Sequence, residues 1–282
     1  MRQANAVVQT VQSDRSTAPA VEAQSLVKTY RGRSGTVEAV RGVDLRVETG
    51  EIFGFLGPNG AGKSTTVKML TTLLSITSGT ARIAGVDVAS QPDAVRQRIG
   101  VALQEAGLDA RQTGRELLVL QGRLFDLSAD AAASRAEELL ELVELTDAAD
   151  RRIKSYSGGM KRRLDLASAL MHEPEVLFLD EPTTGLDPAS RVTVWDEVRR
   201  INERGTTVFL TTQYLEEADA LCDRLAIIDD GRIVREGTPA QLKAELTQRL
   251  GLAHEASLDD VFLDATGRTR VHVAGEVQEV KA

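Results

Sequence analysis

The sequence predicts an α/β fold built on a mixed sheet, and three observations lead to that prediction. A glycine-rich segment, 57–64, stands between a short apolar strand pattern and a helical pattern. Strand and helix patterns alternate again in the second half of the chain. Before the glycine-rich segment, strand patterns follow one another with glycine-containing turns between them, which favours an antiparallel region. The 282 residues suffice for one large domain or two small ones.

Composition narrows the functional classes. The formal net charge is -8, from 34 Lys and Arg against 42 Asp and Glu. This balance argues against a broad nucleic-acid surface and against unaided docking on anionic lipid. Cys222 is the single cysteine, so no internal disulfide can form, and its helical context predicts a buried thiol. No apolar run reaches the roughly twenty residues that span a bilayer. We therefore expect a soluble intracellular chain with no nucleic-acid partner.

The first part of the chain is expected to contain mostly strands. Residues 1–20 are small and polar, and we expect a disordered tail there, with order beginning near Val21. A helix over 64–74 should follow the glycine-rich segment, because Val67, Leu70 and Leu74 recur at helical spacing. The other elements expected in this part are short strands at 21–30, 36–50, 51–56, 80–88 and 99–103, and a short helix at 92–98.

A helix-rich segment then interrupts the alternation, and we predict an inserted helical subdomain over about 105–170. The elements expected after its start are helices at 113–124, 128–145, 188–204, 215–222 and beyond Pro239, strands at 175–180, 206–211, 225–228 and 232–235, and a turn at Asp230-Gly231. The predicted organisation is a tail over 1–20, a nucleotide-binding domain over 21–240, and a C-terminal helix and tail over 241–282.

The glycine-rich segment fits the phosphate-loop pattern G-x-x-x-x-G-K-[ST]. Its glycines let backbone N–H groups approach phosphate oxygens, and the following helix N-terminus adds positive potential. The lysine can reach the β- and γ-phosphates, and the serine hydroxyl can hold Mg²⁺. An incidental glycine-rich turn is the alternative, and the flanking strand and helix argue against it. We therefore predict ATP and Mg²⁺ binding at Gly57, Pro58, Asn59, Gly60, Ala61, Gly62, Lys63, Ser64 and Thr65.

Two acids end the predicted strand at 175–180. Asp180 is placed to meet Mg²⁺ beside the phosphate loop. Glu181 follows at the strand tip, where a carboxylate can orient or deprotonate the water that attacks the γ-phosphate. Two solvated acids at a strand end are common, but here they follow a phosphate loop. We predict Asp180 and Ser64 as metal ligands, and Glu181 and Lys63 as catalytic residues.

A second anion site is predicted at Ser157, Gly158 and Gly159. Ser157 can cap a helix, and the two glycines leave bare N–H groups at its positive end. With its neighbours Tyr156 and Met160, this stretch resembles the signature of the nucleotide-binding subunits of ABC transporters, usually LSGGQ. The resemblance extends from about 23 to 239. It implies a P-loop NTPase of the ABC ATPase type, with an antiparallel β subdomain and an inserted helical subdomain.

The resemblance also implies roles for residues outside the motifs above. Tyr30 matches the aromatic residue that stacks on adenine, although a packing tyrosine is the alternative. Gln104 matches a glutamine that contacts Mg²⁺ and faces the membrane partner, and Asp187 belongs to a loop that crosses a dimer interface. The stretch SLDDVF at 257–262 looks most like the daunorubicin/doxorubicin-resistance branch of drug-export ATPases.

One position departs from the family pattern. Gln213 stands where the family usually has a histidine that contacts the γ-phosphate. Glutamine can donate a hydrogen bond but carries no charge, and we predict it as a third catalytic residue. The histidines lie elsewhere, and His172 is expected to be a cap or surface residue.

Taken with the resemblance, these motifs predict an ATP-hydrolysing subunit at the cytoplasmic face of the cell membrane. Two copies would sandwich two ATP molecules and drive a separate integral membrane permease that exports a drug or other hydrophobic small molecule. One alternative is a soluble ABC-type ATPase acting on nucleic acid or ribosomes, and another is a non-hydrolysing nucleotide switch. A GTPase is disfavoured because the base-reading Asn-Lys-x-Asp sequence is missing.

Overall fold

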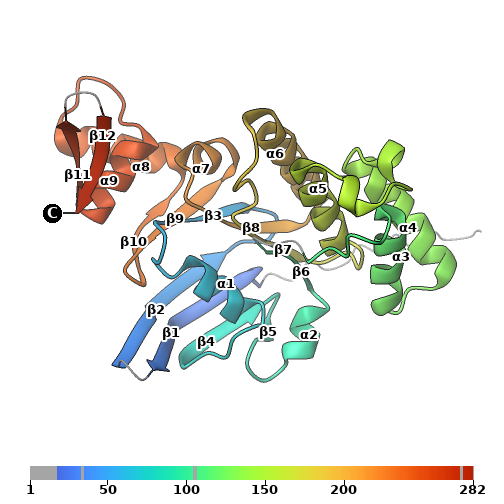
Figure 1. Cartoon of the computed structure of the whole chain (residues 1–282). Coiled ribbons are helices and arrows are strands. Elements are labelled where there is room, and N and C mark those ends of the chain that lie inside the picture. Colours follow the sequence, from blue (N-terminus) through green and yellow to red (C-terminus); the bar gives the residue numbers. More distant parts are fainter. Residues whose placement is uncertain (1–17, 33–34, 104–106, 274–275, 282) are drawn as a thin grey trace, which may run out of the picture.

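The computed structural model describes residues 18–32, 35–103, 107–273 and 276–281. The predicted tail therefore lies almost wholly outside the described residues, and so does Gln104. The fold is α/β, as predicted, and Figure 1 shows its two main sheets one above the other, with helices along the upper one. No helix in these ranges combines the length and the apolar character needed to cross a membrane.

The first sheet is antiparallel, with strand order β2-β1-β4-β5. The second sheet is mixed and has the order β10-β9-β3-β8-β7-β6, in which only β10 runs antiparallel to its neighbour. The strands of the two sheets are β1 (Val21–Gly32), β2 (Gly35–Val47), β3 (Ile52–Leu56), β4 (Ser78–Ile83), β5 (Val86–Asp87), β6 (Ile99–Ala102), β7 (Val176–Asp180), β8 (Thr207–Thr212), β9 (Arg224–Asp229) and β10 (Arg232–Gly237).

The strands predicted at 21–30, 36–50 and 51–56 are present as β1, β2 and β3. β1 and β2 are single strands of 12 and 13 residues. Their pairing register shifts on both sides of Leu26, and the residues left out of the pairing there include Ser25 and Gly42. Both have positive φ, 49° and 77°. The turn-forming residues are thus absorbed as bulges, which bend a strand without ending it.

The helix after the phosphate loop, α1 (Lys63–Leu70), ends four residues before the predicted Leu74. The Thr71 hydroxyl donates to the Val67 carbonyl over 2.8 Å. At Thr72 the chain takes a φ of +63°, which no helix continues. The apolar spacing therefore continues beyond the end of the helix. Leu74 lies in the turn that follows and packs against the apolar core from there.

Three helices between β6 and β7 gather at one end of the mixed sheet (Figure 1). They are α3 (Gly114–Leu124), α4 (Ala129–Leu142) and α5 (Gly158–Ala169), with 3-10 turns at Thr146–Ala148 and Ile153–Ser155. A capping box of Thr113 and Glu116 starts α3, and Ser128 caps α4. The limits of a helical subdomain, about 105–170, remain a prediction.

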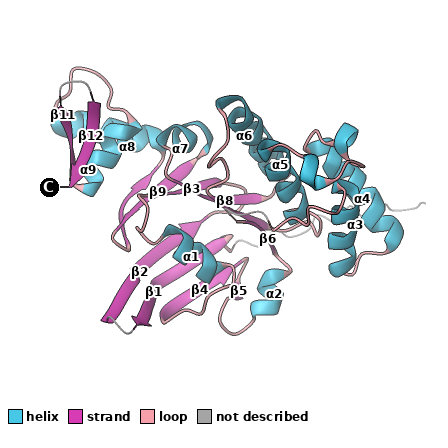
Figure 2. Ribbon diagram, viewed as in Figure 1, coloured by secondary structure: helices cyan, strands magenta, loops and turns pink. Residues whose placement is uncertain are grey.

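The other helices are α2 (Pro92–Arg96), α6 (Pro188–Glu203), α7 (Leu215–Leu221), α8 (Pro239–Leu250) and α9 (Leu258–Thr266). The expected mixed tail contains α9 and a hairpin of β11 (Arg268–Val273) and β12 (Glu276–Lys281). Together with α8 these elements lie at the end of the molecule opposite α3 and α4 (Figure 2).

The mixed sheet is buried on both faces. Along β3, Ile52 and Leu56 belong to the apolar cluster on the helix side, whereas Phe53 and Phe55 belong to the cluster shared with the antiparallel sheet. Phe53 and Phe55 both pack on Phe209 of β8, with ring centroids 5.6 and 5.7 Å apart. This alternation fixes the register of the parallel strands, so their carboxyl ends are held in fixed positions at one edge.

Candidate functional site

The glycine-rich loop joins β3 to α1 and requires glycine at two points in particular. Gly62 has a φ of +108°, and a Cβ there would lie 2.5 Å from the Ala39 carbonyl oxygen. A Cβ on Gly57 would lie 2.4 Å from the carbonyl oxygen of Ile228. The close approach of three backbone segments thus holds the loop at the N-terminus of α1, which is the arrangement that binds phosphate.

Lys63 is the first residue of α1 and only 4 % exposed. Its Nζ donates to the carbonyl oxygens of Gly57 and Pro58, over 2.8 and 3.2 Å. The same Nζ lies 3.4 Å from Oε1 of Glu181. Burial lowers the pKa of Lys63, and the charge of Glu181 opposes that shift. A buried ammonium group is therefore held inside the curve of the loop, close to an acid.

Glu181 follows β7 in a left-handed conformation, with a φ of +49°. Its N–H donates to the carbonyl and the hydroxyl oxygen of Thr211 on β8, over 3.1 and 3.0 Å. The Thr184 hydroxyl donates to Oε2 of Glu181 over 3.2 Å. Uncommon backbone geometry at a non-glycine residue costs free energy and clusters at functional sites. Here it directs the carboxylate toward Lys63.

Asp180 ends β7 and fits a cation site. Its Oδ1 accepts from the Thr211 hydroxyl over 2.6 Å and from the Ser64 hydroxyl over 3.2 Å. The side chain is buried, and in the described ranges no Lys or Arg nitrogen lies within 4.0 Å of the carboxylate. A buried carboxylate without an ion-pair partner, next to a hydroxyl, is a suitable pair of oxygen ligands for Mg²⁺.

Lys63, Ser64 and Glu181 share one cavity of about 260 Å³. The cavity brings together the phosphate loop, the predicted catalytic pair and Gln213, which the sequence placed far apart. Its lining residues are Ala39, Asn59, Gly60, Gly62, Lys63, Ser64, Thr65, Glu181, Thr184 and Gln213.

The predicted site residues on other segments do not line this cavity; they are Tyr30, Ser157, Gly158, Gly159 and Asp187. Ser157 is exposed at the start of α5, where its Oγ accepts from the Met160 N–H over 3.2 Å. Asp187, also exposed, caps α6 and accepts from the Ser190 N–H over 3.0 Å. The two helix starts adjoin, because a Cβ on Gly159 would lie 3.1 Å from the Ser190 hydroxyl oxygen.

Tyr30 also lies outside the cavity, on β1. It is 42 % exposed, and the Nζ of Lys28 lies 5.4 Å from its ring centroid. The adenine-stacking role of Tyr30 and its packing alternative both remain predictions.

Sequence reasoning missed two threonines of the site. Thr184 bonds Glu181, and Thr211 bonds both Asp180 and Glu181. A weak signal exists for each: Thr184 lies three residues after Glu181, and Thr211 ends a predicted strand on the same sheet. A hydroxyl that orients a carboxylate is recognised only once its neighbours in space are known.

His172 was wrongly expected to be a cap or surface residue. Its ring stacks on Phe125 with centroids 3.9 Å apart, and Nε2 lies 2.9 Å from the Ile99 carbonyl oxygen. Burial lowers the pKa of His172. The imidazole is thus a half-buried packing group, whereas Cys222 is buried as predicted.

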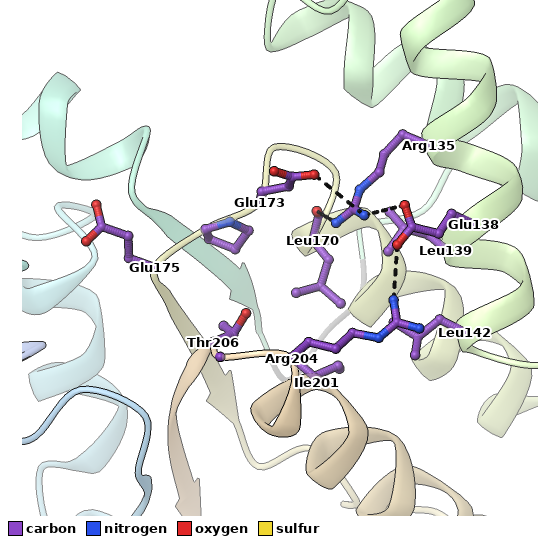
Figure 3. A pocket seen from close by; sticks show the side chains of 12 residues that line it. Arg135, Glu138, Leu139, Leu142, Leu170, Glu173, Glu175, Ile201, Arg204 and Thr206 are labelled. Carbon is purple, nitrogen blue, oxygen red and sulfur yellow. Dashed lines mark hydrogen bonds and ion pairs between the residues drawn. The ribbon is translucent and has the colours of Figure 1, made fainter. Parts of the chain in front are cut away.

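A second, larger cavity of about 370 Å³ lies between α4, α6 and the loop before β7 (Figure 3). Glu138 accepts there from Arg135 over 2.6 Å and from Arg204 over 3.1 Å. None of the predicted site residues lines this cavity. Size alone therefore does not mark the functional site of this chain.

Comparison with known proteins agrees with the geometry. A family model described as ABC transporter matches residues 40–184. The chain is 56% identical over 227 residues to the daunorubicin/doxorubicin resistance ATP-binding protein of Streptomyces peucetius, covering 80% of this chain and 68% of that protein. It is 48% identical over 210 residues to the Nod factor export ATP-binding protein I of Burkholderia lata, covering 74% and 69%.

Among solved structures, the chain resembles an ATP-binding cassette described as a dimer in a post-hydrolysis state bound to ADP and Pi. The TM-score is 0.71 at 27% identity, and the match covers 77% of this chain and 98% of the other.

Proposed function

This chain belongs to the ABC transporter family as an ATP-binding subunit with ATPase activity, and on that premise we propose that it energises export of a drug or other hydrophobic small molecule through a separate membrane permease. The observation that carries the proposal is the buried Lys63–Glu181 pair at the phosphate loop, 3.4 Å between Nζ and Oε1. The names of the relatives point to export, and to drugs in particular.

For hydrolysis, we assign the γ-phosphate to the loop N–H groups and Lys63, and the attacking water to Glu181. An incoming γ-phosphate would replace the Glu181 carboxylate as the anionic partner of Lys63. Glu181 would then be free to accept a proton from water. The bond from water oxygen to phosphorus forms as the bond to the bridging oxygen breaks, leaving ADP and phosphate. Gln213 lines the same cavity and is assigned as a neutral donor to the γ-phosphate.

We assign Mg²⁺ to Ser64 and Asp180, which supply a hydroxyl and a buried carboxylate 3.2 Å apart. A bound Mg²⁺ would supply positive charge that offsets the charge of the phosphates. Asp180 is held in one orientation by Thr211, whose hydroxyl donates to it over 2.6 Å. Gln104, the third ligand implied by the resemblance, lies outside the described residues.

We propose that a second copy of the chain completes each ATP site. Ser157 and Gly158 are exposed at the start of α5 and line no part of the phosphate-loop cavity. A helix N-terminus favours an anion, which supports our assignment of a second anion site there. In a dimer, Ser157 and Gly158 of one copy would contact the phosphates that Lys63 of the partner copy binds. A Ser157→Arg chain and a Lys63→Ala chain should each be defective, and mixing them should restore part of the phosphate release. No recovery on mixing would argue against shared sites.

The permease is proposed to dock in an apolar groove of about 360 Å³ between the turn after α1, β6, α3 and the end of α5. Leu73 in this groove is 59 % exposed. The side chains of Phe125 and Val101 also line the groove, and both are half-buried. The described residues offer no helix that crosses a membrane, so a transport function needs such a partner. A cytoplasmic segment of the permease with apolar side chains would cover this groove.

The export proposal is tested in cells that express the full chain together with a candidate permease subunit. Efflux of a fluorescent anthracycline should be fast with the wild-type chain and absent with Glu181→Gln. Leu73→Asp should abolish efflux while the purified chain still releases phosphate. ATP hydrolysis without efflux of any hydrophobic probe would favour the alternative of a soluble ATPase, and ATP binding without hydrolysis would favour a nucleotide switch.

A further inference from the structure

Arg162 is a buried charge on α5 that the assignments above do not use. Its side chain is 7 % exposed, and burial lowers the pKa of its guanidinium, against the charges of Asp165, Glu217 and Asp180. The chain buries this cation one turn after Ser157, at the start of the helix that carries the proposed second anion site. Burying a charge costs free energy unless the charged group is fully hydrogen-bonded.

All five N–H donors of the guanidinium have acceptors. Nε donates to the Pro182 carbonyl over 2.9 Å, and Nη1 donates to the Leu103 carbonyl over 2.6 Å and to Oδ2 of Asp165 over 3.2 Å. Nη2 donates to the carbonyls of Ala102 and Asp180, over 3.5 and 3.4 Å. Four of the five acceptors are therefore backbone carbonyls, which fix the course of the chain rather than the orientation of side chains.

These carbonyls belong to two neighbouring strand ends. Asp180 and Pro182 lie on either side of Glu181, whereas Ala102 is the last residue of β6 and Leu103 follows it. β6 and β7 are adjacent and parallel, with Ala102 opposite Leu179. One guanidinium thus connects the first turn of α5 to the strained turn that directs the Glu181 carboxylate.

We propose that Arg162 is a positioning residue that sets the place of Glu181 according to the position of the Ser157–Gly159 segment on the same helix. The proposal rests on the shared-site function proposed above. A partner's phosphates that engage Ser157–Gly159 would shift the start of α5, and Arg162 would carry that shift to the turn at Glu181. Each chain's hydrolysis would thereby depend on whether its own signature segment is engaged.

The test compares Arg162→Lys with Arg163→Lys in the full chain. Arg163 is the adjacent residue on α5, and its Nη1 donates to the carbonyls of Val143 and Glu144, with no bond to β6 or β7. Lysine keeps the charge and length but cannot bond both strand ends. We expect Arg162→Lys to lower kcat roughly 10–100-fold with little change in the KM for ATP, because a misplaced catalytic group costs about that much. Arg163→Lys should leave kcat within about twofold.

Two further measurements separate positioning from folding and from the proposed function. Thermal unfolding and binding of a fluorescent ATP analogue show whether both variants remain folded and loaded. In a Glu181→Gln background, Arg162→Lys should lower the residual rate little further, because the two changes act through one group.

An equal loss of kcat in the two lysine variants would overturn the proposal, and so would fully additive losses with Glu181→Gln. A wild-type chain that binds ATP without hydrolysing it would instead overturn the proposed function. If Arg162→Lys does not fold, Asp165→Asn provides a second variant. It leaves the guanidinium in place without its counterion and should lower kcat by a smaller factor.

Discussion

The cavity at the glycine-rich loop and the cavity in Figure 3 both bring acidic and basic side chains together, but they hold them differently. At the loop, the side chains of Lys63 and Glu181 are 4% and 8% exposed. In the other cavity, those of Arg204 and Glu138 are 53% and 48% exposed. Water screens the second pair and not the first. The candidate ATP site is therefore distinguished by buried charges next to an anion-binding backbone, and not by the size of its cavity.

The largest expected effect comes from removing the confined carboxylate. Glu181→Gln should bind ATP and hydrolyse it slower by about 10²–10⁴, the usual contribution of a positioned base. Phosphate release at saturating ATP measures this rate, and a fluorescent ATP analogue measures binding. Glu138→Gln is the matched control, since it makes the same chemical change in the other cavity. Similar rates in the two variants would erase the distinction between the cavities.

A smaller effect is expected at Gln213. Gln213→Ala removes one neutral donor from the loop cavity, so hydrolysis should slow about fivefold, because a net hydrogen bond contributes about 1 kcal/mol. The KM for ATP should change less than kcat if the bond strengthens in the transition state. Steady-state kinetics over a range of ATP concentrations separates the two. Unchanged kcat would mean that Gln213 lines the cavity without taking part in the reaction.

The loop cavity could be predicted from sequence to the extent that it is local. The residues of the phosphate loop are consecutive, and Asp180 and Glu181 end one strand, so pattern and spacing identify them. The short apolar pattern at 51–56 likewise predicted the strand that the structure shows as β3. What local pattern cannot supply is pairing across the fold. Thr211 meets Asp180 only because β8 lies beside β7 in the sheet.

Arg162 shows the same limit more sharply. Its acceptors at Ala102 and Leu103 lie about sixty positions earlier in the chain, and nothing in its helical context distinguishes it from Arg163. The early end of α1 was also unpredictable from periodicity, since Thr72 leaves the helix while Leu74 keeps its apolar spacing. Tertiary contacts determine both the bonding of Arg162 and the end of α1, and helix propensity alone predicts neither.

A third region tests whether burial alone makes a site. Glu197 of α6 is 1 % exposed, and in the described part of the chain neither carboxylate oxygen has a hydrogen-bond partner. Burial raises its pKa to about 8, against the pull of Arg163, and the nearby charge of Glu144 raises it further. The Arg163 Nη1 atom lies 3.9 Å from Oε1. This acid lines neither cavity, so we expect it to affect stability and not hydrolysis.

The sign follows from proton binding. Below about pH 4.5 both the folded and unfolded states hold the proton on Glu197. As the pH rises to about 8, the unfolded chain releases the proton and the folded chain keeps it, so the free energy of unfolding falls through this window. Glu197→Gln cannot ionise. The Tm of the variant minus that of the wild type should therefore increase from pH 5 to pH 9, with phosphate release at neutral pH unchanged. A constant Tm difference would contradict the assignment.

The smallest effect is expected in the cavity of Figure 3, from Glu138→Gln. This change removes the acceptor of Arg135 and Arg204, at 2.6 and 3.1 Å. Glu138 is half exposed in both pairs, and ion pairs in contact with water contribute about 0–1 kcal/mol, because water screens the charges and long side chains lose freedom. Urea unfolding should thus show a loss below about 1 kcal/mol at low salt, and a smaller loss near 1 M salt, where the Debye length shrinks to about 3 Å. Hydrolysis should not change. A fall in kcat would mean that contacts between α4 and α6 control the phosphate-loop cavity from a distance, and the two cavities would then have to be treated as one coupled system.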